Sequence, residues 1–210
     1  HSCVMLSTRA EALRFPHGDI ALGFCGECGF ISNVAFNPHL VDYSGSYEDQ
    51  PSFSSTFNAF TQDLAKRLIE KYSLHDKEIL EIGCGKGDFL ASLCELGHNR
   101  GLGIDPAYTK GRIGSKVSDS LTFIKDYYSE RYANYHGDLV CCRHTLEHIY
   151  DTPRFVGTVR SAIGDRLHTI VFFEVPDVTR LLRELAFWDI YYEHCSYFSP
   201  GSLAGLFRSC

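Results

Sequence analysis

The sequence predicts an α/β fold, with a doubly wound, mostly parallel sheet and a small N-terminal knuckle and hairpin module. From residue 51 onward, short apolar runs alternate with segments of helical periodicity, the pattern of parallel strands joined by crossover helices. One of these runs leads into three glycines at alternate positions and then into a helix. Residues 1–50 instead hold a C-x-x-C-G motif between two strand-like pieces. We therefore expect a small module over 1–50 and a larger domain over 51–210.

The composition is that of an ordinary soluble globular protein, with 44% hydrophobic and 22% charged residues. A net charge of −6 without a Lys/Arg cluster argues against nucleic acid as a partner. No apolar run approaches the roughly 20 residues of a membrane span. Nine cysteines, several inside expected strands or helices, indicate reduced thiols in the cytoplasm rather than a disulfide framework. A small molecule is the expected partner, and the oligomeric state is left open.

The central segment begins with an apolar strand over 79–82 and continues into a helical pattern that Gly97 is expected to cap. Between strand and helix stand Gly83, Gly85 and Gly87. Such a turn brings bare backbone and the free N–H groups of a helix start close to a ligand. Its G-x-G-x-G spacing differs from the G-x-G-x-x-G of dinucleotide enzymes, which disfavours a dehydrogenase, and no Lys-Ser/Thr pair follows as in a P-loop.

A second strand over 100–105 ends in Asp105. This carboxylate lies about 20 residues after the first glycine, the separation at which an acid meets ribose hydroxyls in nucleotide-binding folds. Alone, Asp105 would be read as a solvated turn residue before Pro106. Together with the glycine turn, ribose binding is favoured.

The other elements follow from periodicity and caps. A helix is expected over 57–72 with Ser55 or Thr56 as its N-cap, and another over 153–163 that Gly164 ends. Apolar runs predict further strands over 121–124, 138–142 and 169–174. A last helix begins with Ser199 as its cap and Pro200 at its first position.

The N-terminal motif contains Cys25 and Cys28, whose C-x-x-C spacing suggests half of a tetrahedral zinc site. A second knuckle is missing, since Cys3 with His1 or His17 does not have the required spacing. The motif is therefore either a partial zinc knuckle or a hairpin with two free thiols.

Several motifs together resemble a known family. Glu81-Ile-Gly-Cys-Gly-Lys-Gly87 and Gly103-Ile-Asp-Pro106 look like the first two motifs of class I S-adenosylmethionine-dependent methyltransferases, which have a Rossmann-like fold. The segments 142–149 and 187–198 resemble the branch of sugar C-methyltransferases, which carries an N-terminal zinc module and a Tyr-Glu-His catalytic segment. In that branch the partner knuckle lies further upstream and a C-terminal domain follows. The chain is accordingly expected to be trimmed at both ends.

The resemblance implies S-adenosylmethionine as cofactor, with a structural zinc if the knuckle is completed. Asp126 then corresponds to the acid that contacts the adenine amine, and Arg143 could reach the methionine carboxylate. The cofactor-binding residues that it implies are Glu81, Gly83, Cys84, Gly85, Gly87, Asp105, Pro106, Asp126, Cys142 and Arg143. Tyr47 is the best match to a tyrosine that borders the active site, although an exposed loop tyrosine explains it nearly as well.

The segment 189–198 concentrates titratable and aromatic side chains. Methylation of carbon needs a base, because carbon is a poor nucleophile until it is deprotonated next to a carbonyl. We assign His194 as general base, with Glu193 and Tyr192 assisting, and place Trp188 and Tyr197 against the substrate. The alternative is an aromatic lid that only positions substrate, as in many O-methyltransferases. Glu147 and His148 are interpreted as residues of a helix start rather than as catalysts.

The sequence therefore predicts S-adenosylmethionine-dependent C-methylation of a small molecule such as a nucleotide-linked keto sugar. O- or N-methylation of another metabolite is the second hypothesis. A cofactor- or zinc-binding scaffold without catalysis is the third.

Overall fold

The computed structural model describes residues 4, 6–41, 43, 54–110 and 118–210. The chain separates into two compact units, each described by itself. The sheet unit comprises Asp49–Arg143 and Thr158–Phe173. The hairpin unit comprises His1–Glu48, His144–Gly157 and Glu174–Cys210.

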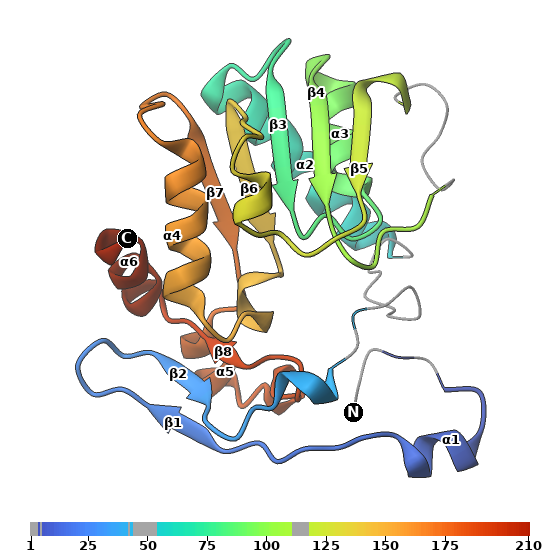
Figure 1. Ribbon diagram of the computed structural model, residues 1–210, viewed down its shortest axis with the longest axis vertical. Helices are drawn as coiled ribbons and strands as arrows, with labels where there is room; N and C mark the ends of the chain where they lie inside the picture. The colour runs from blue at the N-terminus through green and yellow to red at the C-terminus, as the bar shows by residue number, and fades with distance from the viewer. Residues whose placement is uncertain (1–3, 5, 42, 44–53, 111–117) are drawn as a thin grey trace. The chain divides into compact units, whose positions relative to one another are not determined.

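Five strands form the sheet, in the order β5-β4-β3-β6-β7 (Figure 1). Their bounds are Glu78–Ile82 (β3), Arg100–Ile104 (β4), Leu121–Ile124 (β5), Leu139–Arg143 (β6) and Ile170–Glu174 (β7). β3 pairs in parallel with β4 on one side and β6 on the other, and β4 pairs in parallel with β5. The strand order therefore reverses at β3, which is the switch point of doubly wound sheets. The predicted α/β, mostly parallel fold is confirmed.

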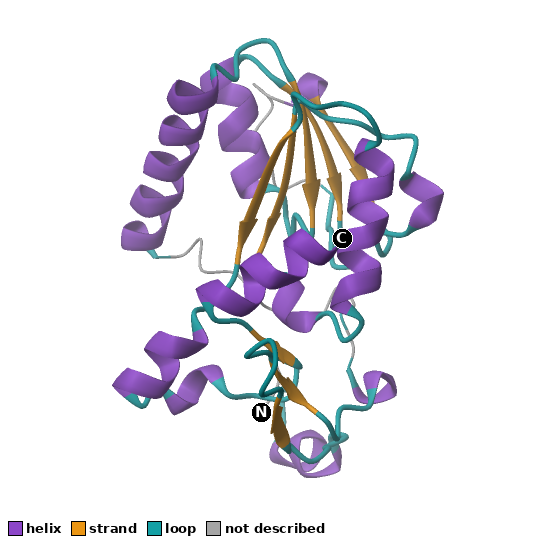
Figure 2. Cartoon of the chain, turned by 90° about the vertical axis from the view of Figure 1, so that its left-hand side faces the viewer, coloured by secondary structure: helices purple, strands orange, loops and turns teal. Residues whose placement is uncertain are grey.

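Helices lie on both faces of the sheet (Figure 2). On one face, α2 (Ser55–Tyr72) and α3 (Asp88–Gly97) pack together. Ile79 and Leu139 point to these two helices, whereas Leu80 and Val140 lie with the end of α4 (Thr152–Ile163) around a small cavity on the other face. This alternation follows from the two-residue period of a strand.

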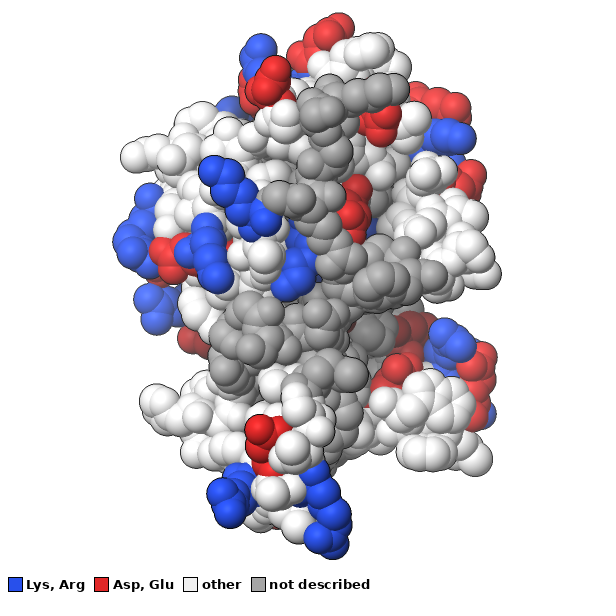
Figure 3. All heavy atoms as spheres, turned by 90° about the vertical axis from the view of Figure 1, so that its right-hand side faces the viewer, with Lys and Arg blue, Asp and Glu red and all other residues white. Residues whose placement is uncertain are grey.

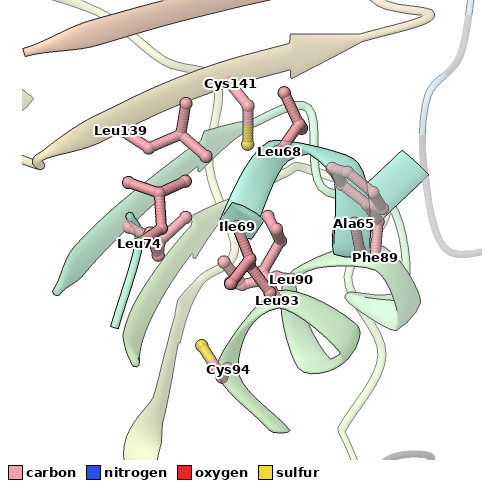
Figure 4. Close-up of a cluster of buried hydrophobic side chains, with 11 residues drawn as sticks. Ala65, Leu68, Ile69, Leu74, Phe89, Leu90, Leu93, Cys94, Leu139 and Cys141 are labelled. Carbon is pink, nitrogen blue, oxygen red and sulfur yellow. The ribbon is translucent and has the colours of Figure 1, made fainter. Parts of the chain in front are cut away.

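The core of the sheet unit consists of apolar side chains from α2, α3, β3 and β6 (Figure 4). Its buried members are Ala65, Leu68, Ile69, Leu74, Ile79, Phe89, Leu90, Leu93, Cys94, Leu139 and Cys141. Burial of a large apolar side chain is worth about 1.5–3 kcal/mol, so this cluster supplies much of the stability that holds the strand ends in place.

Two helix caps differ from the sequence prediction. Ser54 caps α2, one residue before the expected Ser55 or Thr56. α3 continues through Gly97 and ends at His98, which takes a left-handed φ of 55°. Gly97 is required for space instead: a Cβ there would lie 2.4 Å from the Leu74 carbonyl oxygen and 2.3 Å from the Asn99 amide.

The hairpin unit is built on a three-stranded sheet in the order β1-β2-β8. Its strands are Leu22–Phe24 (β1), Ile31–Asn33 (β2) and Ser196–Tyr197 (β8), and its complete helices are α1 (Arg9–Arg14), α5 (Val178–Glu184) and α6 (Pro200–Ser209). Both strand pairs are antiparallel. The sequence predicted the β1–β2 hairpin and the start of α6, but not α1, α5 or β8.

The short 3-10 turns of the described chain cover Pro38–Leu40, Ser118–Ser120, Glu130–Tyr132, Leu146–His148 and Phe187–Asp189.

Asn33 connects the N-terminal hairpin to the segment that precedes β8. Its backbone N–H donates to the Cys195 carbonyl at 2.9 Å. Its side chain, fully buried, accepts from the N–H groups of Ala21 and Ala35 and donates to the Asp19 carbonyl. The N-terminal residues thus help to fix the backbone beside His194.

The surface and the cysteines agree with the composition. Lys/Arg and Asp/Glu side chains are interspersed over the described part of the face in Figure 3. The eight cysteines among the described residues are free thiols. No helix of the described chain has the length and apolar character needed to cross a membrane.

Replacement of Asn99 by Ala is expected to destabilise the protein by about 2–4 kcal/mol. Asn99 is 1% exposed; its side chain accepts from the Lys77 N–H and donates to the carbonyls of Leu74 and Leu93. Alanine would leave these three backbone groups without their partner. Urea unfolding measures the change, with Asn134→Ala at an exposed position as the matched control. Equal stability of the two variants would contradict the prediction.

Candidate active site

The glycine turn after β3 has the backbone that its sequence predicts. Gly83, Gly85 and Gly87 have φ angles of 70°, 54° and 89°, a region that disfavours residues with a Cβ. Gly87 is the N-cap of α3 and provides no side-chain cap, so the first N–H groups of the helix are not capped by it. The Gly83 N–H donates to the Ile104 carbonyl at 2.9 Å, which joins the turn to the end of β4. The turn therefore consists of glycine backbone without side chains at three alternate positions, next to the first turn of α3.

Asp105 follows β4 and faces this turn. Its carboxylate accepts from the Gly85 N–H at 2.8 Å and from the Ala107 N–H at 2.6 Å. Burial raises its pKa, and the opposing influences are these two N–H groups and the charge of Lys86. Pro106 is half-buried in the same loop.

A second buried carboxyl belongs to Glu81, which is 3% exposed. Burial raises its pKa to about 8, although the Arg143 charge and the Leu90 N–H favour the ionised form. The Arg143 guanidinium lies 4.1 Å from the centre of the Phe89 ring, a cation–π contact. Glu81 and Arg143 thus bring an acid and a base to the ends of β3 and β6.

The remaining predicted cofactor residues lie at the same ends of the strands. Cys84 and Cys142 are buried, and a Cβ at Gly103 would lie 2.6 Å from the Cys84 sulfur, so this strand position must be glycine. Asp126 already accepts from the Tyr127 N–H at 2.8 Å, from Arg131 at 2.7 Å and from the Tyr132 hydroxyl. These donors lower the pKa of Asp126, led by the Tyr132 hydroxyl.

In the hairpin unit, His194 is 6% exposed and has a defined tautomer. Its Nδ1 lies 3.1 Å from the Asp189 carbonyl oxygen, which can only accept, so Nδ1 carries the proton. Nε2 is therefore the basic nitrogen, and it accepts from the Tyr191 hydroxyl at 2.5 Å. A proton can pass between Tyr191 and His194 along this bond.

His148 lies edge-on to His194, with ring centres 4.9 Å apart. Its Nδ1 donates to the Glu193 carbonyl at 3.0 Å and lies 3.1 Å from the Tyr43 hydroxyl, so it too carries its proton on Nδ1. The backbone of residues 193–195 is held here as well, because the Cys195 N–H donates to the Glu147 carbonyl.

Burial is the main cause that keeps these two rings neutral. Burial lowers the pKa of both His194 and His148 to about 4. Burial also disfavours a charged His144, but Glu147 and Glu174, each 3.6 Å from a ring nitrogen, outweigh it and raise the pKa of His144 to about 9. The Glu147 carboxylate, 2% exposed, favours a proton on His194. The cluster therefore holds a neutral base beside a buried anion that would stabilise its protonated form.

A protein-family model described as a methyltransferase domain matches residues 57–209. The chain belongs to this family. The match includes the glycine turn, Asp105 and the His194 segment. The prediction of a class I S-adenosylmethionine-dependent methyltransferase is thus confirmed at the level of family and fold.

Similar proteins agree with this family. The C-methyltransferase NovU of Streptomyces niveus is 29% identical over 170 residues, which cover 79% of this chain and 40% of that protein. The chain therefore spans about 40% of that relative's length.

Two solved structures share the fold. The N,N-8-amino-8-demethyl-D-riboflavin dimethyltransferase RosA from Streptomyces davawensis is 15% identical, with a TM-score of 0.53 over 76% of this chain and 53% of that chain. The 1,6-didemethyltoxoflavin-N1-methyltransferase from Burkholderia thailandensis is 12% identical, with a TM-score of 0.50 over 75% and 70%.

The residues of the methyltransferase that were predicted to assist His194 have other partners in the structure. Tyr191, rather than Tyr192, contacts His194. The Tyr192 hydroxyl instead accepts from the Asn37 N–H at 2.9 Å, and its ring packs on Phe36. Glu193 is 4% exposed, and its carbonyl orients His148. The assisting roles of Tyr192 and Glu193 stay predictions.

The predicted substrate residues differ in exposure. Trp188 is 63% exposed and makes an edge contact with Phe187. Tyr197 is buried in the core of the hairpin unit, with its ring centre 6.3 Å from that of His194. Tyr47 lies outside the described residues. Their contacts with substrate stay predictions.

The two cysteines of the predicted zinc knuckle lie at the surface of the methyltransferase. Cys25 and Cys28 are exposed, and hydrogen bonds from the Cys28 and Glu27 backbones lower the pKa of the Cys25 thiol. These are two of the four ligands of a tetrahedral zinc site, and no further His, Cys, Asp or Glu groups with them in the described part of the chain. Zinc binding stays a prediction.

Among the described residues, the donor atoms of Glu147, His148 and His194 lie within 4.8 Å of one another, a spacing that a metal ion could bridge. The Tyr191 hydroxyl already occupies the free nitrogen of His194. Hydrogen bonding accounts for the arrangement without a metal.

Sequence reasoning assigned no catalytic role to Tyr43, Glu147, His148 or Tyr191. His148 was interpreted as a helix-start residue, and it does close a short 3-10 turn over Leu146–His148. The sequence signal for its place beside His194 is the His-x-x-x-His pattern of His144 and His148 just after a buried strand.

The Glu81→Gln variant should lose less stability than the wild type as the pH rises. A raised pKa means that folded Glu81 keeps its proton while the unfolded chain ionises above pH 4.5, so wild-type stability falls until about pH 8. At about 1.4 kcal/mol per pH unit, the difference between the two proteins should change by on the order of 4 kcal/mol from pH 5 to pH 8. Urea unfolding at both pH values tests this, with the exposed Glu95→Gln as control. Parallel pH profiles for Glu81→Gln and wild type would rule it out.

Proposed function

We propose that the protein transfers a methyl group from S-adenosylmethionine to a carbon atom of a small keto compound, namely a nucleotide-linked sugar. The observation that carries the proposal is the Tyr191–His194 pair, in which a buried, neutral imidazole presents its basic nitrogen to a hydroxyl group. Carbon methylation needs such a base.

The sheet unit has the features required to hold the cofactor. The glycine turn admits close approach of a nucleoside, and the Asp105 carboxylate retains lone pairs for ribose hydroxyls. Arg143 would meet the methionine carboxylate, and Asp126 would exchange one of its present donors for the adenine amine. When bound there, S-adenosylmethionine supplies an electrophilic methyl group on a sulfonium and leaves as neutral S-adenosylhomocysteine.

The hairpin unit would move the proton. A hydrogen next to the keto group passes to the Tyr191 oxygen while the Tyr191 proton passes to Nε2 of His194. The carbon then carries the electron pair of the broken C–H bond and uses it to bond the methyl group. Glu147, buried and close to the cluster, stabilises the imidazolium until it returns its proton to solvent.

The substrate class rests on similarity. The 29% identity is to a C-methyltransferase, and the segment 191–194 reads Tyr-Tyr-Glu-His, like the catalytic segment of the sugar C-methyltransferase branch. Exposed aromatic side chains at Phe187 and Trp188 could stack on a sugar ring.

O- or N-methylation is the competing activity, and one experiment separates the two. A C-methyltransferase whose base acts on the keto compound should exchange the adjacent hydrogen with deuterium from solvent when S-adenosylhomocysteine is bound. O- and N-methyltransferases do not remove a hydrogen from carbon, so they should not catalyse this exchange. A screen of nucleoside-diphosphate keto sugars, with mass detection of a gain of about 14 Da for CH₂, identifies the acceptor.

With that acceptor, His194→Asn should lower kcat about 100- to 10,000-fold, the usual contribution of a general base, and Tyr191→Phe should lower it less. Both variants should bind S-adenosylhomocysteine as well as the wild type does, since neither residue is assigned to the cofactor. Steady-state kinetics and calorimetry measure the two effects. His39→Asn, at an exposed position of the hairpin unit, is the matched control. Full turnover by His194→Asn would remove the proposed base.

A further inference from the structure

A lysine is buried inside the glycine turn. Lys86 stands between Gly85 and Gly87 and is only 5% exposed, which is unusual because lysines are seldom buried unless they are paired. Its ammonium donates to the Ala107 carbonyl at 2.8 Å. This bond joins the turn after β3 to the loop after β4.

Asp105 joins the same two segments. One carboxylate oxygen accepts from the Gly85 N–H at 2.8 Å and the other from the Ala107 N–H at 2.6 Å. Lys86 and Asp105 therefore both bind the backbone of Ala107. Lys86 donates to its carbonyl, and Asp105 accepts from its N–H. The orientation of the carboxylate depends on these bonds.

The charge of Lys86 also matters to Asp105. Burial favours the neutral form of this carboxyl, and Lys86 is the cation that opposes it, together with the two N–H groups. A second carboxyl, Glu81, is near enough for Asp105 to raise its pKa. Arg143 favours the ionised form of Glu81, and Lys86 favours that of Asp105. Without Lys86, Asp105 would lose this favourable charge. Asp105 would then tend to hold a proton and accept hydrogen bonds less well.

We propose that Lys86 is a positioning residue for the cofactor: through its bond to the Ala107 carbonyl and its buried charge, it holds the Asp105 carboxylate where it can accept hydrogen bonds from ribose hydroxyls. The proposal rests on the assignment of Asp105 as the ribose contact in the proposed function. Lys86 acts through Asp105 and the loop after β4.

A double-mutant cycle tests this role by calorimetry with S-adenosylhomocysteine on the full chain. Lys86→Met should weaken binding at least about tenfold in the wild-type background, because it removes the counter-charge of a buried carboxylate. In the Asp105→Asn background the same change should weaken binding less than about twofold, since an amide needs no counter-charge. Lys66→Met, at an exposed position on α2, should bind like the wild type.

A second variant separates charge from hydrogen bonding and guards against misfolding. Lys86→Gln keeps a donor for the Ala107 carbonyl but removes the charge, so it should also weaken binding about tenfold. Thermal unfolding reports whether each variant is folded, and the cycle is run with Gln if the Met variant is not. Wild-type affinity in Lys86→Gln would overturn the proposal, as would an equal loss in both Asp105 backgrounds.

The outcome is independent of the acceptor, because S-adenosylhomocysteine binding requires none. If the wild type binds this compound but methylates no carbon acid, the proposed function fails while the role of Lys86 stands. If the wild type does not bind it, the cofactor assignment and the role of Lys86 fail together.

Discussion

Positive φ angles at Gly83, Gly85 and Gly87 are the constraint on which the sheet unit depends. A side chain at these positions would cost conformational energy, because a Cβ is disfavoured in the left-handed region. Because the backbone turns so sharply, β3 and α3 are adjacent and the Gly85 N–H points to Asp105. β3, which leads into this turn, lies between β4 and β6, whose ends hold the other residues predicted to bind the cofactor.

The second constraint is the balance of charge around titratable side chains, which differs between the two units. In the sheet unit, acids are matched by bases: Glu81 interacts with Arg143, and Asp105 with Lys86. The bases favour the ionised carboxylates, but burial outweighs them and raises the pKa of both acids. In the hairpin unit, His144 lies between two acids and carries the positive charge, while its neighbours His148 and His194 stay neutral. One arrangement suits the binding of a polar nucleoside, and the other suits proton transfer.

Much of the fold could be predicted because its signals are local. Strand periodicity located β3 to β7 to within one residue at either end, since parallel strands that are buried on both faces are nearly continuous apolar runs. Asp105 was found from its distance to the glycine turn. The caps were predicted less accurately. Gly97 is the last residue of α3 and His98 is its C-cap, and the close approach of Leu74 and Asn99 is what requires a glycine at position 97.

Most of what was missed depends on contacts between distant segments. β8 is two residues long and exists only because β2 pairs with it, so no periodicity could reveal it. That pairing, with the Cys195–Glu147 hydrogen bond, brings the loop after β6 beside residues 189–195. Tyr191 rather than Tyr192 is the partner of His194, because the Tyr192 hydroxyl is bonded to the distant backbone of Asn37.

The sequence by itself determined the fold class, the glycine turn with its acid, and His194 as the candidate base. These depend on residue type and short-range spacing. Only the tertiary structure decided their protonation, hydrogen bonding and burial. It set the tautomers of His148 and His194, the donors to Asp105 and the burial of Lys86. The physical reason is that protonation and hydrogen bonding are set by neighbours in space, and those neighbours come from strands and loops far apart in the chain.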